Sequence, residues 1–397
     1  MTESLPGALA GLLVIDAARV LAGPYAAMLL ADLGASVVKV EQPGGGDDTR
    51  NWGPPFTEGG VSAYYLAVNR GKRGVAIDLR QDAGRGVFDA LLARADVLIE
   101  NFKAQTREAF ALSGEATSRR FPRLVHAAIS GFGATGAYAS RPGYDNVAQA
   151  ASGLMSITGP PEGEPHKVGV AVSDLAAGLH AAVAILAALR HRDATGLGQF
   201  VDVSLFDASL GLLANVASSS LVSGEEPRRW GNAHPSIVPY QTVRAADGLL
   251  MLAVGNDLQF RALAKMLEEP AWADDLRFAT NPARVRHREA LIPMIEERFS
   301  RRPAADWLAA LAGAGIPAGP VHTVSEALGS PEAANRGMVV RAGDVPMVAP
   351  VPKLSRTPAQ AVSMPPRLGE HTDEVLREVL WYDDARIAAL RAAGEIA

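Results

Sequence analysis

The first 200 residues alternate between short apolar runs and helical patterns, and this alternation constrains the fold more than any other feature of the sequence. The runs 12–16, 36–41 and 96–100 have the length and apolar content of buried parallel strands. Helical patterns stand between such runs, and glycine or proline marks several of the boundaries. We therefore predict an α/β fold with a mostly parallel, Rossmann-like sheet covered by helices on both faces.

The length of 397 residues favours two domains rather than one. Polar and turn residues dominate from Ser220 to Pro239, and a hairpin with Asp247-Gly248 in its turn follows at 240–254. We predict that residues 1–219 form the N-terminal part of a large α/β domain. Residues 220–328 form a linker and a smaller α+β domain, and residues 329–397 return to the large domain.

Charge and composition exclude several classes of function. The net charge of -5 creates no basic field for nucleic acid, and the absence of cysteine excludes a thiolate nucleophile and a cysteine zinc site. No metal site is predicted. Uncharged apolar runs stay below the about 18–20 residues of a membrane span, and residues 1–7 lack the basic region of a signal peptide. We expect a cytoplasmic protein without a membrane or nucleic-acid partner.

A glycine motif at Gly131–Gly136 matches the dinucleotide-binding pattern G-x-G-x-x-G. The pattern requires a long helix after the third glycine, but Pro142 prevents one there. A flexible glycine loop explains the motif better than a nicotinamide cofactor does. The Gly-x-Ser-x-Gly elbow of an α/β-hydrolase is absent as well.

Asp174 stands at the start of an alanine-rich helical pattern, after a glycine-rich loop and the apolar run 168–172. One interpretation is structural, because Ser173 or Asp174 in this position can cap the helix. The other is chemical, because a carboxylate in an apolar, glycine-lined turn can act as a nucleophile. The residues alone leave both interpretations open.

Other polar residues lie near predicted strand ends or in loops. Arg80, Asn101 and Lys103 follow two predicted strands, where ligands of parallel sheets bind, and they fit either a phosphorylated ligand or a solvated rim. His234 lies in the loop 230–235, between glycine and proline. It is either an ordinary loop histidine or a catalytic one.

Short motifs spread over nearly the whole chain resemble the class III coenzyme A transferases, the family of formyl-CoA transferase, carnitine CoA-transferase and the acyl-CoA racemases. The matching segments are Leu13–Asp16 with Leu21–Pro24, Leu33–Glu41 with Gly45–Asp47, Asn69–Arg73, Ile99–Phe102, Ser130–Gly133, Thr195–Gln199 and Gly315–Val321. The resemblance implies an interlocked homodimer in which each chain is a ring threaded through the other.

The resemblance also implies a mechanism in which Asp174 is the nucleophile. Asp174 attacks an acyl-CoA thioester, and an aspartyl anhydride and then an enzyme–CoA thioester follow. We expect the amino end of the helix to keep Asp174 ionised. Coenzyme A is then a substrate, with no permanently bound cofactor. The coenzyme contacts implied by position are Leu21, Ala22, Ile77, Arg80, Asn101, Lys103 and Tyr144.

The sequence departs from the family pattern at informative positions. Ala109 stands where the family often has an arginine, with Arg107 close by, so one phosphate contact is open. Tyr144 replaces the histidine of the racemase branch, which disfavours the alternative function of an acyl-CoA racemase or isomerase. The four-glycine loop of the oxalate enzymes is absent, and the loop 230–234 resembles the family's mobile loop over the site.

The run Gly231–Tyr240 resembles the branch that moves coenzyme A from succinyl-CoA to dicarboxylates such as glutarate, itaconate, citramalate or mesaconate. The second carboxylate of such an acid needs a cationic partner, and the planar guanidinium of arginine suits it. Candidates are Arg50, Arg73 and Arg141.

Overall fold

The computed structural model describes residues 7–360 and 362–397. The prediction that the N-terminus is not a signal peptide concerns residues that mostly lie outside this described part. The chain forms two compact units, which are described separately. The first unit contains residues 7–154, 167–225 and 331–397, and the second contains residues 155–166 and 226–330. The short segment 155–166 lies within the range 1–219 that we predict for the large domain, and it groups with the second unit.

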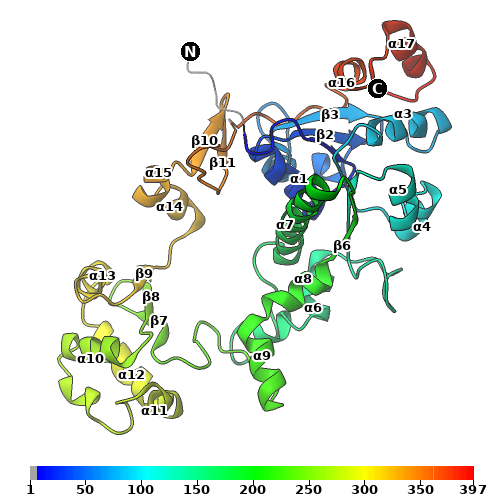
Figure 1. Cartoon of the computed structure of the whole chain (residues 1–397). Coiled ribbons are helices and arrows are strands. Elements are labelled where there is room, and N and C mark those ends of the chain that lie inside the picture. Colours follow the sequence, from blue (N-terminus) through cyan, green and yellow to red (C-terminus); the bar gives the residue numbers. More distant parts are fainter. Residues whose placement is uncertain (1–6, 361) are drawn as a thin grey trace. The chain divides into compact units, whose positions relative to one another are not determined.

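The first unit is built on a six-stranded sheet in the order β3-β2-β1-β4-β5-β6, and every neighbouring pair is parallel (Figure 1). The prediction of a parallel α/β fold is therefore confirmed. The strands are β1 (Leu13–Asp16), β2 (Ser36–Glu41), β3 (Lys72–Ala76), β4 (Val97–Glu100), β5 (Val125–Ser130) and β6 (Phe200–Ser204).

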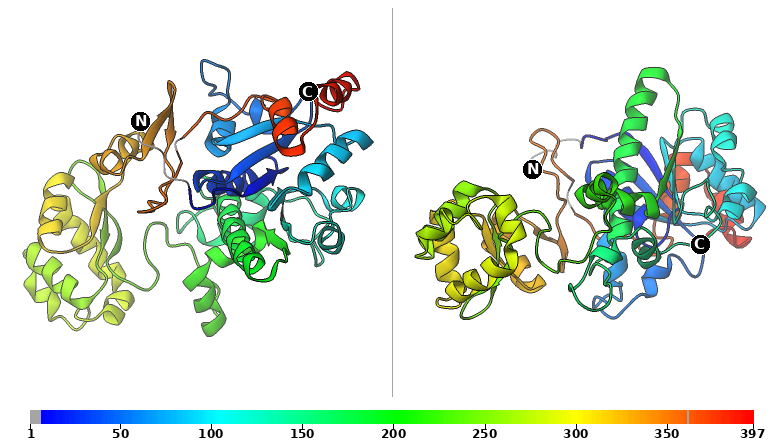
Figure 2. Two further views of the ribbon diagram at one scale, coloured as in Figure 1. Left: turned by 45° about the horizontal axis from the view of Figure 1, so that its top comes forward. Right: turned by 90° about the horizontal axis from the view of Figure 1, so that it is seen from below.

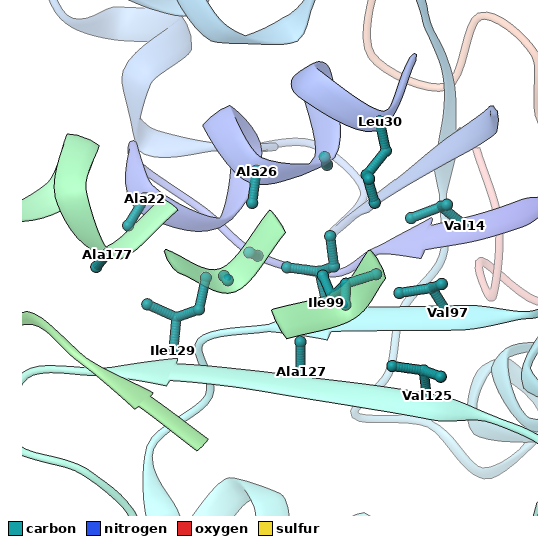
Figure 3. Packing of buried hydrophobic residues seen from close by; sticks show 14 of the residues in the cluster. Val14, Ala22, Ala26, Leu30, Val97, Ile99, Val125, Ala127, Ile129 and Ala177 are labelled. Carbon is teal, nitrogen blue, oxygen red and sulfur yellow. The ribbon is translucent and has the colours of Figure 1, made fainter. Parts of the chain in front are cut away.

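Successive side chains of a strand point to opposite faces of the sheet. Each face of this sheet is buried in its own apolar cluster. Val14 packs in the cluster that contains α1 (Ala22–Asp32), α7 (Val172–Thr195) and α8 (Leu205–Leu212), as Figure 3 shows for α1 and α7. Its neighbour Ile15 packs in the cluster that contains α3 (Asp82–Leu92), α16 (Thr372–Leu380) and α17 (Asp384–Ala392). The last two helices thus return to the first unit (Figure 2).

Short helices fill the connections of the first unit, and the sequence did not predict several of them. Helices α2, α5 and α6 are each seven residues long, which is too short to show two turns of hydrophobic periodicity. The short elements are η1 (Asp48–Asn51), α2 (Ala63–Asn69), α4 (Ala104–Ala109), α5 (Gly114–Arg120), α6 (Asp145–Ala151), α9 (Ala214–Ser223), α15 (Pro331–Asn335), β10 (Val339–Ala342) and β11 (Val345–Val348).

The second unit contains a three-stranded antiparallel sheet in the order β7-β8-β9, packed against helices around an aromatic core. The predicted hairpin with Asp247-Gly248 between its strands is confirmed. Two helices of this unit, α11 and α12, are separated only by His287. The elements are η2 (Met155–Ile157), β7 (Tyr240–Arg244), β8 (Leu249–Ala253), α10 (Asp257–Met266), η3 (Pro270–Ala273), α11 (Asn281–Arg286), α12 (Arg288–Phe299), α13 (Ala304–Gly313), β9 (Ala318–Pro320) and α14 (Val324–Leu328).

Helix α7 is long and apolar enough to cross a membrane, judged by length and composition alone. Helices α8 and α9 pass the same test only as a pair, and they are bent by 75°. Half of the most apolar stretch of α7 is buried in the fold, and α1 packs along the helix (Figure 3). Core helices of globular domains have these properties.

Helices α1 and α7 pack tightly together at Gly178. A β-carbon at this position would lie 2.7 Å from the carbonyl oxygen of Ala22 and 3.0 Å from the ring of Tyr25. The backbone carbonyl cannot move away without shifting the first turn of α1. Glycine is therefore required by packing, not by backbone conformation.

We predict that Gly178→Ala destabilises the protein by about 1–3 kcal/mol, because it overpacks the contact between α1 and α7. Helix propensity alone predicts the opposite, a gain of up to about 1 kcal/mol. Gly86→Ala in α3 is the matched control, because a β-carbon there meets open space. Urea unfolding measures both, and a Gly178→Ala protein as stable as the wild type would contradict the packing argument.

Candidate active site

The amino end of α7 is capped by a side chain from another helix. The backbone N–H groups of Ser173 and Asp174 point at Oδ1 of Asp145 in α6, with N···O distances of 2.8 and 3.4 Å. The prediction that Ser173 or Asp174 caps the helix is therefore wrong. Both residues lie inside the first turn, and the Ser173 hydroxyl is buried and accepts a hydrogen bond from Ser209.

A glutamine holds Asp145 in its capping position. Gln149 lies four residues later on the same face of α6, and its Nε2 donates to Oδ2 of Asp145 at 2.6 Å. Its Oε1 accepts from the backbone of Val168 at 2.9 Å, in the segment that leads into α7. No role for Asp145 or Gln149 was predicted from the sequence. Their spacing of one helical turn is the signal that could have indicated one.

The carboxyl group of Asp174 has an unusual protonation equilibrium. Burial and the nearby negative charge of Asp145 raise its pKa to about 7. We had expected the helix end to favour the ionised form, but burial and the like charge prevail. A carboxyl group with a pKa near neutrality is poised between its two forms, as catalytic carboxyl groups in enzymes often are.

Tyr64 of α2 also lies within the electrostatic reach of this carboxyl pair. Burial, and then the negative charges of Asp174, Asp145 and Asp47, raise the pKa of Tyr64 to about 12. Its ring meets Trp52 edge-to-face at 5.0 Å, which limits its freedom. Tyr64 therefore keeps its proton near neutral pH and can donate it to an anion. The sequence gave no signal for this residue, because its role depends on contacts across distant segments.

The strand order creates a topological switch point between β1 and β4, where ligands of open α/β sheets bind. The loops after these two strands are joined there. Oδ1 of Asn101 accepts from the backbone of Arg19 at 3.0 Å, and its Nδ2 donates to the Arg19 carbonyl at 2.8 Å. Leu21 and Lys103 lie shortly after these joined positions, so the predicted contacts of both loops share one edge of the sheet.

Two further predicted coenzyme contacts lie next to the start of α7. Tyr144 directly precedes α6 and the capping residue Asp145, and it is 65% exposed. Ala22 presents its carbonyl oxygen to Gly178, one helical turn after Asp174. The structure thus brings these two positions close to the candidate nucleophile.

The remaining two predicted contacts belong to the segment after β3, at the edge of the sheet. The Arg80 guanidinium donates twice to Asp78, each time at 2.8 Å, and these bonds hold the pKa of Asp78 well below its usual range. The side chain of Ile77 is fully buried, and its backbone forms an isolated antiparallel bridge with Ile396. A coenzyme contact at Ile77 would therefore have to use the backbone.

The three arginine candidates for a distal carboxylate have different surroundings. Arg50 is bonded to Glu41 and Tyr65, and Arg73 lies near the amino end of β3, paired with Glu374 and Glu378. Arg73 thus lies toward the edge of the sheet opposite to the carboxyl edge, where α7 begins. Arg141 stacks on Tyr138 at 3.8 Å and has no ion-pair partner within residues 7–360 and 362–397.

Arg107 is not available to bind a phosphate group in place of the arginine that the family often has at the position of Ala109. Its Nε donates to Glu100 at 2.7 Å, and the side chain is buried. His126 shares the same carboxylate oxygen at 3.2 Å. The cation is thus committed to a buried cluster. Lys103 is exposed, and in the described part of the chain it has no ion pair.

His234 belongs to the second unit. Its Nδ1 accepts a hydrogen bond from the backbone of Ser236 at 3.0 Å, and burial and Arg288 lower its pKa, so the ring is neutral. The loop 230–233 lines a cavity of about 610 Å³ together with residues 158–161 of the same unit. Arg228 and Arg288 stack on Trp230 at 3.9 and 4.1 Å. In the described residues, histidine and acidic side chains form no group of three that could hold a metal ion.

The sequence model of CoA-transferase family III matches residues 9–372. The chain belongs to CoA-transferase family III. A succinate–glutarate CoA-transferase of Agrobacterium fabrum is 45% identical over 94% of this chain and 95% of its own length. A human succinyl-CoA:glutarate CoA-transferase is 40% identical over 98% of this chain and 90% of its own length. The resemblance found in the sequence is thereby confirmed.

A solved structure agrees with this assignment. A CaiB/BaiF family protein from Brucella suis superposes with a TM-score of 0.84, at 44% sequence identity, and covers 94% of this chain and 100% of its own. The protein is therefore a class III CoA-transferase with acyl-CoA as a substrate.

The raised pKa of Asp174 predicts a cost in stability. The folded state holds the proton of the Asp174 carboxyl group more tightly than the unfolded chain does. The stability that this bound proton contributes is lost as pH rises from about 4 to about 7. Asp174→Asn cannot ionise, so it should exceed the wild type in unfolding free energy at pH 8 by about 1–3 kcal/mol, and by less at pH 5.

Urea unfolding at both pH values measures this difference. Asp193→Asn, an exposed site on the same helix, is the control and should show no such change. An Asp174→Asn advantage that is equal at both pH values would contradict the raised pKa.

Proposed function

We propose that the protein moves coenzyme A from succinyl-CoA to a short dicarboxylic acid, with Asp174 as the nucleophile. The observation that supports this most directly is the Asp174 carboxyl at the carboxyl edge of the parallel sheet, where burial and Asp145 raise its pKa to about 7. The names of the relatives from Agrobacterium fabrum and Homo sapiens support succinyl-CoA as donor and glutarate as one acceptor.

The proposed reaction has four balanced steps. The Asp174 carboxylate attacks the thioester carbonyl of the donor, an anhydride forms and the coenzyme leaves as a thiolate. The thiolate attacks the Asp174 carbonyl, which gives an enzyme–CoA thioester and releases the donor acid. The acceptor carboxylate then attacks this thioester and expels the thiolate again. Finally the thiolate attacks the acyl carbonyl of the second anhydride, which yields the new acyl-CoA and regenerates Asp174.

The surroundings of Asp174 fit these steps. Each attack creates an oxyanion that needs fixed hydrogen-bond donors, and the protonated Tyr64 hydroxyl is a candidate. Leu21, Ala22, Asn101, Lys103 and Tyr144 are proposed to bind the coenzyme, with contributions from Arg80 and the Ile77 backbone. Lys103 is the available cation for a phosphate group near the switch point.

Arg141 is the proposed partner of the distal carboxylate. Arg50 and Arg73 already hold acidic partners, whereas the Arg141 guanidinium only stacks on Tyr138. The loop 230–234 with His234 is proposed to be the counterpart of the mobile loop that closes over the site in the family. Closure keeps water from the anhydrides, which water would hydrolyse.

We also propose a cytoplasmic, permanent homodimer with interlocked chains. Apolar side chains on two helices of the first unit support a partner subunit. Leu221 and Val222 of α9 are 87% and 90% exposed, and Leu179 and Val183 of α7 are exposed as well. Exposed apolar surface of this kind is typical of interfaces between subunits. Light scattering that gives the mass of one chain would contradict the dimer.

An acyl-CoA racemase is the alternative, but Tyr144 stands where that branch has a histidine base, and phenols release a proton far less readily than imidazoles near neutral pH. Exchange of the α-proton in deuterated water without any acyl transfer would favour this alternative.

We predict that succinyl-CoA supports transfer to glutarate, itaconate, citramalate or mesaconate, and that monocarboxylates of equal length react at least about tenfold less well, because they lack the group that Arg141 pairs with. Arg141→Lys should lower discrimination against the monocarboxylate, because a point charge replaces the fork. Chromatography of the acyl-CoA products measures both. Arg386→Lys is the matched surface control, because Arg386 is exposed and also stacks on a tyrosine, 3.6 Å from the ring of Tyr382.

Equal rates with dicarboxylates and monocarboxylates would contradict the proposed acceptor class. No transfer from succinyl-CoA to any acid would contradict the proposed function.

The pH dependence provides a separate prediction for the donor half-reaction. Because the nucleophile must be ionised, the rate of enzyme acylation in single turnovers should rise with pH through a midpoint near 7. Asp145→Asn removes the negative charge but keeps an oxygen for the Ser173 N–H, so the midpoint should move to lower pH. Asp193→Asn should leave the midpoint unchanged. An upward shift in Asp145→Asn would contradict the electrostatic argument.

A further inference from the structure

We infer that Asp47 and Lys39 are positioning residues that hold the turn before α1 in the conformation that binds coenzyme A. The inference rests on the proposed function, because Leu21 and Ala22, which follow this turn, are assigned there to the coenzyme.

The turn contains a strained residue. Val20 has a φ of 71°, a left-handed conformation that a β-branched side chain disfavours. Such a conformation persists only where the surroundings impose it. Both carboxylate oxygens of Asp47 lie 3.3 Å from the Val20 nitrogen, so Asp47 accepts the hydrogen bond of the strained residue.

Lys39 fixes the other side of the turn. Its ammonium group donates to Asp47 at 2.9 Å and to the carbonyl of Ala18 at 3.0 Å. Lys39 and Asp47 are both fully buried, and a buried charge without its partner is strongly unfavourable. The pair therefore holds Ala18 and Val20, the residues on either side of Arg19.

The turn is connected to the candidate site in two directions. The backbone of Arg19 receives both hydrogen bonds of Asn101, in the loop after β4. Ala22 rests against Gly178, one helical turn from Asp174. A shift of the turn would therefore displace Leu21, Ala22 and Asn101 together, and shifts of about 1 Å at such positions can cost up to about a hundredfold in function.

The alternative is that the pair only stabilises the fold. A second buried pair provides a matched control for this possibility. Arg70 donates to Asp32 at 2.9 and 2.6 Å, in the same unit but at the carboxyl end of α1, away from the turn. Removing either pair removes one buried carboxylate and one buried cation.

The test compares two double variants of the full-length protein, Lys39→Met/Asp47→Ala and Asp32→Ala/Arg70→Met. Both should lower the melting temperature. Only the first should weaken the binding of free coenzyme A, by about tenfold or more in calorimetry. If the first variant does not fold, Asp47→Asn, which keeps one oxygen for the Val20 N–H, should weaken binding by about threefold.

A rescue separates positioning from general destabilisation. Glycine adopts positive φ without strain, so Val20→Gly added to Lys39→Met/Asp47→Ala should recover at least about threefold in coenzyme affinity. Unchanged coenzyme affinity in Lys39→Met/Asp47→Ala, or an equal loss in the control pair, would overturn the inference. A wild type that binds no coenzyme A would instead overturn the proposed function.

Discussion

The electrostatic repulsion between the carboxyl groups of Asp145 and Asp174 at the amino end of α7 is the interaction on which the site depends. Asp145 accepts the first N–H groups of α7, so its negative charge is fixed close to Asp174. That charge and burial together raise the pKa of Asp174 to about 7. The same contact therefore begins the helix and sets the protonation of the residue proposed as nucleophile. Asp145 could cap α7 without a second carboxyl group nearby, so helix capping alone does not explain the buried Asp174.

The sheet places the rest of the site around this pair. Its order brings the loops after β1 and β4 together at the switch point, and Asn101 joins them through the Arg19 backbone. Below this edge, the buried charges of Lys39 and Asp47 hold the strained Val20. A buried ion pair adds little net stability, and this one lies against the turn before Leu21 and Ala22, the residues proposed to bind coenzyme A.

The sequence predicted the parallel sheet, because its strands are uninterrupted apolar runs, and it predicted the family, because short motifs recur in order along the chain. It did not predict α2, α5 and α6, which are too short for periodicity. It left a helix cap from Ser173 or Asp174 open as one interpretation, since the contact of Asp145 with the start of α7 spans 28 residues of sequence. Lys39 within Val37–Val40 was a visible anomaly, but its partner Asp47 emerges only from the fold.

Oxygen transfer to Asp174 tests the central claim, that this carboxylate forms anhydrides with both acids, most directly. The protein would be incubated with succinyl-CoA and an acceptor acid whose carboxylate oxygens are isotopically labelled. Each completed cycle leaves one acceptor oxygen on the nucleophile, because the thiolate cleaves the second anhydride at the acyl carbonyl. Peptide mass spectrometry should then find heavy oxygen in Asp174 of the wild type. Turnover with no label in Asp174, or with the label in another residue, would contradict the account.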